Sequence, residues 1–149
     1  MKIDYMIDKV KRFLSHPLLS YRRVLLGIWT ILSLVGMLKF HRSYNNFLIF
    51  RGVYWHTING TSLYAPYPTE YWDMNHYGPL FSLVIAPFAI LPEWIGMLLW
   101  LIFLSGWLFA AVYWSGLKKQ QQIFIYWFCS FALLTALFMQ QFNIAVAAM

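Results

Sequence analysis

Residues 44–64 read YNNFLIFRGVYWHTINGTSLY, a stretch apolar enough for a membrane that nevertheless carries two adjacent asparagines, an arginine and a histidine. Residues 45–59 contain no proline and are predicted to form a helix that ends at Gly60. At 100° per residue, a sector of about 60° holds four of its residues: Asn45, Gly52, His56 and Asn59. The pattern predicts a helix that lies in the membrane interface or packs under other helices, with one narrow polar stripe.

The composition places this stretch in a membrane protein. Of 149 residues, 61% are hydrophobic and 11% are charged, and the mean hydropathy is +0.58, whereas a soluble domain carries about 25% charged residues. The net charge of +6 comes largely from the amino end and does not indicate nucleic-acid binding. Basic residues in this position are typical of a cytoplasmic amino terminus. We therefore expect a multi-pass protein of a bacterial inner (plasma) membrane.

Two regions follow from the hydropathy pattern. Residues 1–23 are expected to form a basic, amphipathic, cytoplasmic lead-in, in which three apolar residues rest on the lipid surface: Val10, Phe13 and Leu14. Residues 24–149 are expected to form an all-α, polytopic transmembrane helix bundle with an outward loop at 41–78. Because the last apolar run falls short of the roughly 20 residues that a crossing needs, we expect the chain to be the amino-terminal fragment of a longer protein.

About four membrane segments and the start of a fifth make up this bundle. Their expected ranges are 24–40, 79–91, 94–117, 123–139 and 144–149, with Pro79 in a first helical position and a polar break at 118–122. Four crossings from a cytoplasmic start place Lys118 and Lys119 outside, against the preference of basic residues for the cytoplasm. A re-entrant 79–91 segment removes the conflict. The four-crossing arrangement is favoured because the amino-terminal charge bias is larger.

The outward loop holds most of the candidate chemistry. Its carboxylates are Glu70 and Asp73, and His76 follows Asp73 by three residues. A carboxylate and an imidazole in this spacing suit a general base with its orienting partner; the alternative is a solvated loop with a local hydrogen bond. Two such groups are too few for a metal site, so neither a metal nor another cofactor is expected.

Arg51 and the loop aromatics are candidates for substrate binding. An arginine among apolar residues needs a carboxylate, a phosphate or backbone carbonyls as its partner, and its fork matches a lipid phosphate; the alternative is snorkelling to lipid headgroups. Tyr64 and Trp72 suit stacking on a sugar ring or, alternatively, an interfacial aromatic belt.

The order of several short motifs extends over residues 40–149. It comprises Asn46-Phe47, Gly60, Leu63-Tyr64, Tyr77-Gly-Pro-Leu-Phe81, Ala86-Pro87-Phe88-Ala89, Leu91-Pro92, Trp100 and Gln141-Phe142-Asn143. This order resembles the polytopic GT-C-type glycosyltransferases of family 87, which include polyprenyl-phosphate-mannose-dependent mannosyltransferases. The resemblance implies transfer of a mannose-like sugar from a polyprenyl-phosphate donor to a lipid or glycan acceptor on the non-cytoplasmic side, among membrane lipids. It also implies metal-independent inversion and a carboxylate base in the loop after the first crossing.

The resembling family carries its base, an aspartate, fourteen residues ahead of the glycine, where this chain has Asn46. An amide cannot accept a proton at neutral pH, so we expect the base to have moved to Asp73 or, second, to Glu70. His76 serves alone or with Asp73, and Asn46 orients a substrate. Substrate-binding candidates are Asn45, Arg51, His56, Tyr64, Trp72, Gln141 and Asn143. The alternative function is that of a non-enzymatic membrane subunit for transport or lipid binding.

Overall fold

The computed structural model describes residues 5–9, 12 and 16–149, and these residues form helices without strands. The elements are η1 (Pro17–Ser20), α2 (Arg22–Gly36), η2 (Met37–Lys39), α3 (Asn45–Ile58), α4 (Phe81–Ala89), α5 (Glu93–Trp114), α6 (Lys119–Phe138) and α7 (Asn143–Ala147). The all-α prediction is confirmed for this part of the chain. Val10, Phe13 and Leu14 lie outside the described residues, so their contact with lipid stays a prediction.

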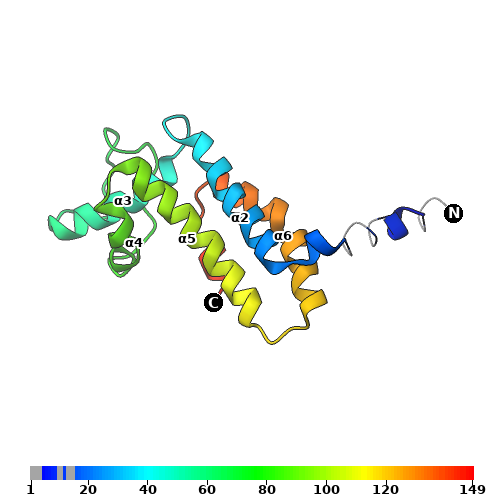
Figure 1. Ribbon diagram of the computed structural model, residues 1–149. Coiled ribbons are helices and arrows are strands. Elements are labelled where there is room, and N and C mark those ends of the chain that lie inside the picture. Colours follow the sequence, from blue (N-terminus) through cyan, green and yellow to red (C-terminus); the bar gives the residue numbers. More distant parts are fainter. Residues whose placement is uncertain (1–4, 10–11, 13–15) are drawn as a thin grey trace.

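The long helix α5 joins two groups of helices (Figure 1). Along most of its length it packs with α2 and α6, while its amino-terminal part packs with α4, which in turn packs against α3. The short α7 returns against α5. The loop between α3 and α4 lies at the end of the molecule away from the amino terminus (Figure 1).

Trp29 anchors the group formed by α2, α5 and α6. Its indole is buried, lies edge-on to Tyr126 at 5.3 Å between ring centroids, and donates a hydrogen bond of 3.1 Å to Ser130 Oγ. One turn further along α2, the buried hydroxyls of Ser33 and Ser105 lie 2.7 Å apart and join α2 to α5. Small residues at such a contact let two helices approach closely, as is common among membrane helices.

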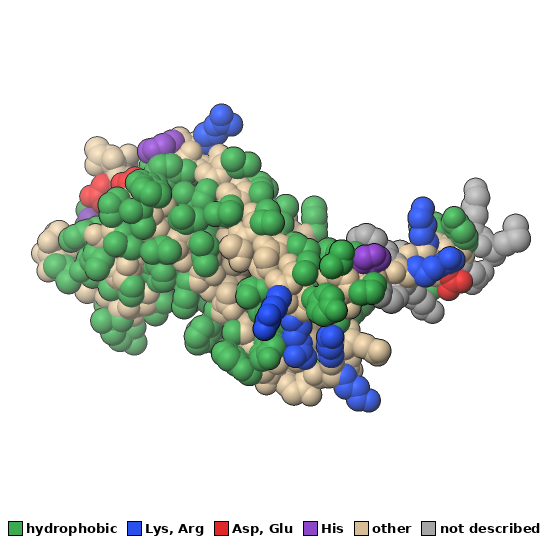
Figure 2. All heavy atoms as spheres, in the orientation of Figure 1, with side chains coloured by type: hydrophobic (Ala, Val, Ile, Leu, Met, Phe, Trp, Pro, Cys, Tyr) green, Lys and Arg blue, Asp and Glu red, His purple; other side chains and the backbone are tan. Residues whose placement is uncertain are grey.

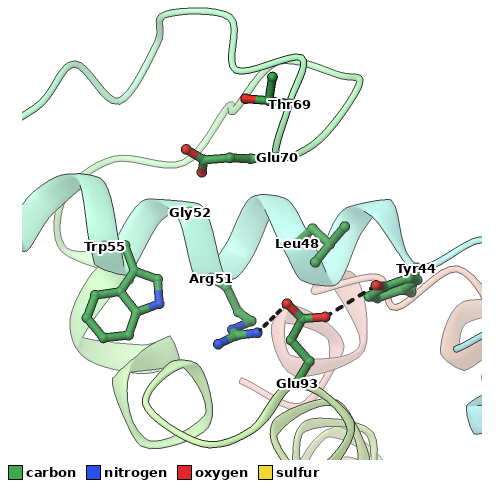
Figure 3. Close-up of a pocket in the computed structure, with 8 residues that line it drawn as sticks. All are labelled: Tyr44, Leu48, Arg51, Gly52, Trp55, Thr69, Glu70 and Glu93. Atoms are coloured by element: carbon green, nitrogen blue, oxygen red, sulfur yellow. Dashed lines mark hydrogen bonds and ion pairs between the residues drawn. The ribbon is translucent and has the colours of Figure 1, made fainter. Parts of the chain in front are cut away.

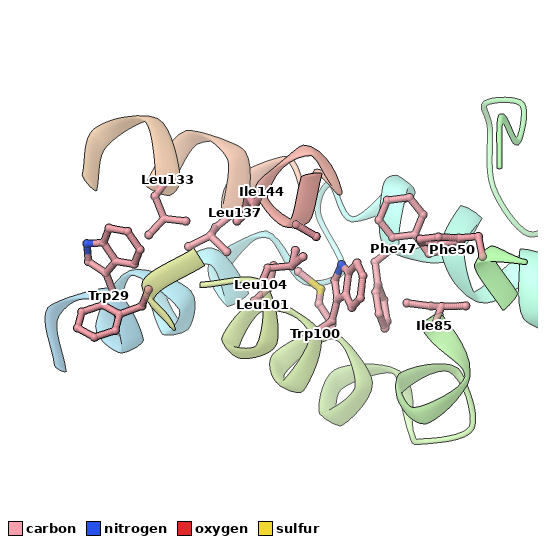
Figure 4. Close-up of a cluster of buried hydrophobic side chains, with 14 of the residues drawn as sticks. Trp29, Phe47, Phe50, Ile85, Trp100, Leu101, Leu104, Leu133, Leu137 and Ile144 are labelled. Carbon is pink, nitrogen blue, oxygen red and sulfur yellow. The ribbon is translucent and has the colours of Figure 1, made fainter. Parts of the chain in front are cut away.

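Trp100 on α5 anchors the second group. Its fully buried ring meets Phe50 of α3 edge-on at 5.9 Å between centroids, and Phe47 and Ile85 complete the layer (Figure 4). The same indole stacks on Phe142 at 6.1 Å, close to the start of α7. The core therefore fixes α3, α5 and the α6–α7 turn relative to one another, and these are the elements that carry the candidate site.

The helix predicted after the first apolar run is confirmed. It was predicted over 45–59 and is observed over Asn45–Ile58, with Gly60 just beyond it at a φ of +66°, a left-handed conformation that favours glycine. The prediction that Pro79 starts the next helix is wrong: Pro79 lies in a turn closed by the hydrogen bond from Phe81 N to Gly78 O, and α4 begins at Phe81.

The break predicted at 118–122 between two helices is observed at 115–118 instead, because α5 ends at Trp114 and α6 begins at Lys119. Lysine and glutamine are good helix formers. The side chain of Gln121 accepts a hydrogen bond of 3.0 Å from Lys118 N, which satisfies a backbone donor at the start of the helix.

Among the described residues, two helices are long and apolar enough to cross a membrane. They are α5, with 22 residues, and α6, with 20 residues. By contrast α4 has 9 residues and reaches only about half of a hydrocarbon core of roughly 30 Å, given about 1.5 Å per residue. These helices do not show the favoured arrangement of four crossings, and the short α4 is in keeping with the re-entrant alternative for residues 79–91.

Basic side chains from the starts of α2 and α6 lie at one end of the bundle. Lys119 Nζ lies 5.9 Å from the ring centroid of Tyr21, and the Arg22 guanidinium lies 4.8 Å from that of Tyr113. Figure 2 shows a cluster of Lys and Arg side chains near the turn between α5 and α6. Lys119 thus lies at the same end of the bundle as Arg22, which favours the re-entrant alternative, while the side of the membrane that this end faces stays a prediction.

Candidate functional site

The loop between α3 and α4 is held over the predicted polar stripe of α3. Asn45 Oδ1 accepts a hydrogen bond of 3.0 Å from Trp72 N. Deeper in the loop, the buried Asn75 bonds through both side-chain atoms, donating to the carbonyls of Leu63 and Tyr77 and accepting from Tyr77 N. The stripe is therefore covered by the chain itself, with Asn45 and His56 buried and Asn59 exposed at the end of the helix.

Gly52 is the reason why this loop can approach α3 so closely. A Cβ atom added at Gly52 would lie 2.6 Å from Tyr71 Cε1, which no side chain tolerates without a shift. The buried Tyr71 therefore rests directly on the helix backbone. Burial, with smaller contributions from Glu70 and Tyr67, raises the pKa of Tyr71 above its ordinary value.

Five polar candidates from three parts of the chain line one hollow of about 300 Å³, which we call the Asp73 hollow. Their side chains belong to α3, to the covering loop and to the α6–α7 turn: Asn46, Asp73, His76, Gln141 and Asn143. The apolar part of the wall includes Ile49, Phe50 and Phe142. Asp73 thus lies in the same hollow as Asn46, the position at which the resembling family carries its base.

The exposed Asp73 has a carboxylate that is partly engaged by its own loop. Its Oδ1 accepts a hydrogen bond of 2.8 Å from Met74 N, which leaves Oδ2 facing solvent or substrate. Although His76 lines the same hollow, the two side chains form neither an ion pair nor a hydrogen bond. The local hydrogen bond of Asp73 is thus observed, while the role of Asp73 and His76 in catalysis stays a prediction.

The other polar groups of the hollow are fixed around the end of α6. Asn46 Nδ2 donates a hydrogen bond of 2.7 Å to the carbonyl of Met139. Beyond it, Gln140 adopts a positive φ of 47° and turns the chain, so that Gln141 and Asn143 face the hollow, where Asn143 Nδ2 donates to Gln141 Oε1 at 3.0 Å.

Glu70 lies apart from the Asp73 hollow. Its Oε2 is 3.2 Å from His56 Nε2, a contact that is ionic only when His56 is protonated and whose angles fall short of a hydrogen bond. His56 is held by a contact of 2.8 Å between its Nδ1 and Thr61 Oγ1 and by stacking on Tyr67 at 3.7 Å between ring centroids. His56 therefore joins α3 to the covering loop, and its role in substrate binding stays a prediction.

Arg51 has both kinds of protein partner that the sequence suggested. Its guanidinium forms an ion pair of 3.0 Å with Glu93 and donates hydrogen bonds to the carbonyls of Ala89 and Leu91 at 3.2 and 3.4 Å. Burial lowers the pKa of Arg51, and the nearby Tyr44 opposes this shift. The arginine thus joins α3 to the turn between α4 and α5 (Figure 3).

The two remaining aromatic candidates stay accessible. The exposed fraction of Tyr64 is 55%, and that of Trp72 is 81%. Within the described part of the chain, no three His, Cys, Asp or Glu side chains converge in a way that could hold a metal ion.

Sequence reasoning missed Glu93 and Trp55, which line the hollow around Arg51 together with Tyr44 and Thr69. A signal for Glu93 was present, because a lone carboxylate directly after Pro92 in an apolar region is the natural partner for an equally isolated arginine. No comparable signal distinguished Trp55 from the other seven tryptophans of the chain, which has 8 in all.

The model of glycosyltransferase family 87 matches residues 75–149, half of the chain. This chain belongs to glycosyltransferase family 87, whose membership implies transfer of a sugar from a donor to an acceptor. The match includes His76, Gln141 and Asn143 of the Asp73 hollow, while Asn46 and Asp73 precede it. No curated protein and no solved structure matches the chain.

Proposed function

We propose that the protein is a GT-C-type membrane glycosyltransferase that moves a mannose-like sugar from a polyprenyl-phosphate donor to an acceptor hydroxyl on the non-cytoplasmic side. Family membership supports the reaction class. The observation that carries the proposal is the Asp73 hollow, in which a loop carboxylate stands beside Asn46 and the polar α6–α7 turn.

In this proposal Asp73 is the general base. With Oδ1 engaged by Met74 N, Oδ2 accepts the proton of the acceptor hydroxyl. The hydroxyl oxygen forms the new bond to the anomeric carbon, and the bond from that carbon to the donor phosphate breaks, so that the phosphate leaves with the electron pair and the sugar carbon is inverted. Asn46 Oδ1 accepts a hydrogen bond that orients a substrate hydroxyl, while Nδ2 stays bound to Met139.

The other candidates contribute less directly to the reaction. Gln141 and Asn143 bind a substrate from the α6–α7 turn that lines the same hollow. Glu70 is a weaker candidate for the base than Asp73, because it is in contact with His56 outside this hollow. Asn45 and His56 act by positioning the loop, since both lie beneath the loop and contact it.

A membrane setting is supported by the surface of α6. Phe124, Phe128 and Phe131 on this helix have exposed fractions of 57%, 75% and 81%. Exposing these rings to water would be unfavourable, at roughly 25 cal/mol per Å² of apolar surface, whereas acyl chains solvate them.

The clustered charges support an orientation of the helices in the membrane. We propose that α2, extended by η2, crosses outward and that α3 and α4 stay on the outer side. Then α5 crosses inward and α6 crosses outward. Arg22, Arg23, Lys118 and Lys119 then all face the cytoplasm, which accords with the distribution of basic residues in membrane proteins. The Asp73 hollow opens on the non-cytoplasmic side.

The donor class is tested with the native protein in membranes that contain, in separate assays, a radiolabelled polyprenyl-phosphate mannose and a radiolabelled nucleotide-linked mannose. The proposal predicts label transfer from the first donor and none from the second when the membranes are free of the enzyme that makes the lipid-linked donor. Transfer from the nucleotide sugar alone would contradict it.

A further inference from the structure

Four basic residues lie at the start of α2 and at the start of α6, and we call them the basic patch: Arg22, Arg23, Lys118 and Lys119. Within residues 16–149, none of the four forms an ion pair. The side-chain carboxylates of that range belong to the α3–α4 loop and to the first residue of α5. Figure 2 accordingly shows the Lys and Arg cluster near the α5–α6 turn with no acidic side chain beside it on this face. The basic patch therefore carries positive charge that the described protein does not compensate.

A hollow of about 440 Å³ opens beside this patch along the first two turns of α6, and we call it the α6 hollow. Five residues line it: Leu117, Gln120, Gln121, Phe124 and Ile125. Lys118 and Lys119 lie between two of these residues in the chain, and Gln121 Oε1 accepts the hydrogen bond of 3.0 Å from Lys118 N. The α6 hollow and the basic patch are therefore adjacent.

The wall of the α6 hollow changes from polar to apolar along the helix. The exposed amides of Gln120 and Gln121 follow the two lysines directly. Phe124 and Ile125 come one turn later, about 6 Å further along α6 given about 1.5 Å per residue, and the exposed fraction of Phe124 is 57%. In the proposed orientation α6 enters the membrane from the cytoplasm at this end. The order of charge, amide and apolar ring then matches the phosphate, the glycerol esters and the acyl chain of a phospholipid.

We propose that the basic patch and the α6 hollow bind an anionic glycerophospholipid of the cytoplasmic leaflet. Its phosphate lies at Lys118 and Lys119, its ester groups meet the two glutamine amides, and one acyl chain lies against Phe124. Basic pockets at the cytoplasmic side of membrane helices suit such headgroups. The apolar part of the wall favours a lipid over free phosphate, since a hydrated ion gains nothing there. The inference rests on the proposed membrane orientation and not on the proposed sugar transfer.

Native mass spectrometry of the whole chain in detergent, titrated with phosphatidylglycerol or with phosphatidylcholine of the same acyl chains, tests the charged part of the site. We expect tighter binding of phosphatidylglycerol. Lys118→Gln combined with Lys119→Gln should weaken it about 25-fold, at about fivefold for each basic residue. The matched control, Lys39→Gln combined with Arg42→Gln, removes the same charge beyond the other end of α2 and should bind like the native protein.

Phe124→Ala tests the apolar part of the site. It should weaken phosphatidylglycerol binding, whereas Phe131→Ala, which removes a ring from the same helix outside the hollow, should not. Equal losses in these two variants would overturn the proposal.

Three further results would also overturn it: equal binding of the two lipids, equal losses in the two double variants, or displacement of phosphatidylglycerol by inorganic phosphate, which would indicate a site for free anions. Replacing both Lys118 and Lys119 by arginine keeps the charge and should keep the binding. A loss as large as that of the glutamine variant would show that the charge is not the cause. Because the readout is lipid binding, the result does not depend on whether the protein transfers a sugar.

Discussion

Asn46 Nδ2 lies 2.7 Å from the carbonyl oxygen of Met139, to which it donates a hydrogen bond across 93 residues of chain. The contact joins the first turn of α3 to the end of α6, next to the residue that turns the chain toward α7. A donor is therefore required at this position. An aspartate, which the resembling family carries here, would place a carboxylate oxygen against the carbonyl oxygen.

We predict that Asn46→Asp does not improve sugar transfer and lowers the thermal stability of the protein. The lost hydrogen bond and the new repulsion should together cost about 1–2 kcal/mol. Asn46→Ala, which removes the donor without adding charge, should cost less. Thermal unfolding followed in detergent measures both variants, and a rise in stability or in transfer rate with Asn46→Asp would contradict the role assigned to Met139.

The helices were largely predictable from the sequence, while the length of the helix within residues 79–91 was not. The sequence located α3 and α5 to within a few residues, because Gly60 marks the end of the first apolar run and Pro92 marks the start of the second. It did not reveal that residues 79–91 hold a helix of only 9 residues, because a Pro79 turn and a helix start look alike in sequence. The predicted side of the membrane for Lys118 depends on whether this segment crosses.

Gly52→Ala should loosen the loop that covers α3. The new Cβ atom would lie 2.6 Å from Tyr71 Cε1, and the buried ring must move, at an expected cost of about 1–3 kcal/mol. The matched control is Gly106→Ala on α5, where nothing lies within 4 Å of the added atom and helix propensity gains up to about 1 kcal/mol. Comparison of the two unfolding temperatures checks the prediction, which equal shifts would refute.

Arg51→Met should destabilise the contact between α3 and the α4–α5 turn. It removes two hydrogen bonds to carbonyls and the ion pair with Glu93. The expected cost is about 1–3 kcal/mol, with only a minor share from the ion pair because the Glu93 side chain is 42% exposed. The control is Arg42→Met, which makes the same change of charge on an exposed turn. If thermal unfolding shows that Arg42→Met lowers stability more than Arg51→Met, the structural role of Arg51 is disproved.

The proposed orientation predicts opposite labelling of two single cysteines. In a Cys129→Ala background, an impermeant thiol reagent added to intact cells should label Asn59→Cys, and Gln120→Cys should react only after the cells are opened. Both parent residues are exposed, so access is decided by the membrane. Labelling of Gln120→Cys in intact cells would restore the arrangement with four crossings.

The candidate site was predictable as a list of residues but not as an arrangement. Glu70, Asp73 and His76 are neighbours in sequence, yet Glu70 turns to His56 while Asp73 joins Asn46 and Gln141 in another hollow. Periodicity cannot reveal this division, because it arises from the long loop and from the α6–α7 turn, where no regular spacing applies. The isolated Arg51 and Glu93 could have been paired from the cost of burying an unmatched charge.

The rate of sugar transfer by Asp73→Asn, compared with that of Glu70→Gln in the same membranes with a polyprenyl-phosphate sugar donor, tests the central claim most directly. The two variants make the same chemical change at two loop carboxylates, only one of which lies in the Asp73 hollow. If Asp73 is the general base, Asp73→Asn should lower the rate by about 10²–10⁴-fold, and Glu70→Gln should retain most of it. Transfer at the wild-type rate by Asp73→Asn would contradict the account.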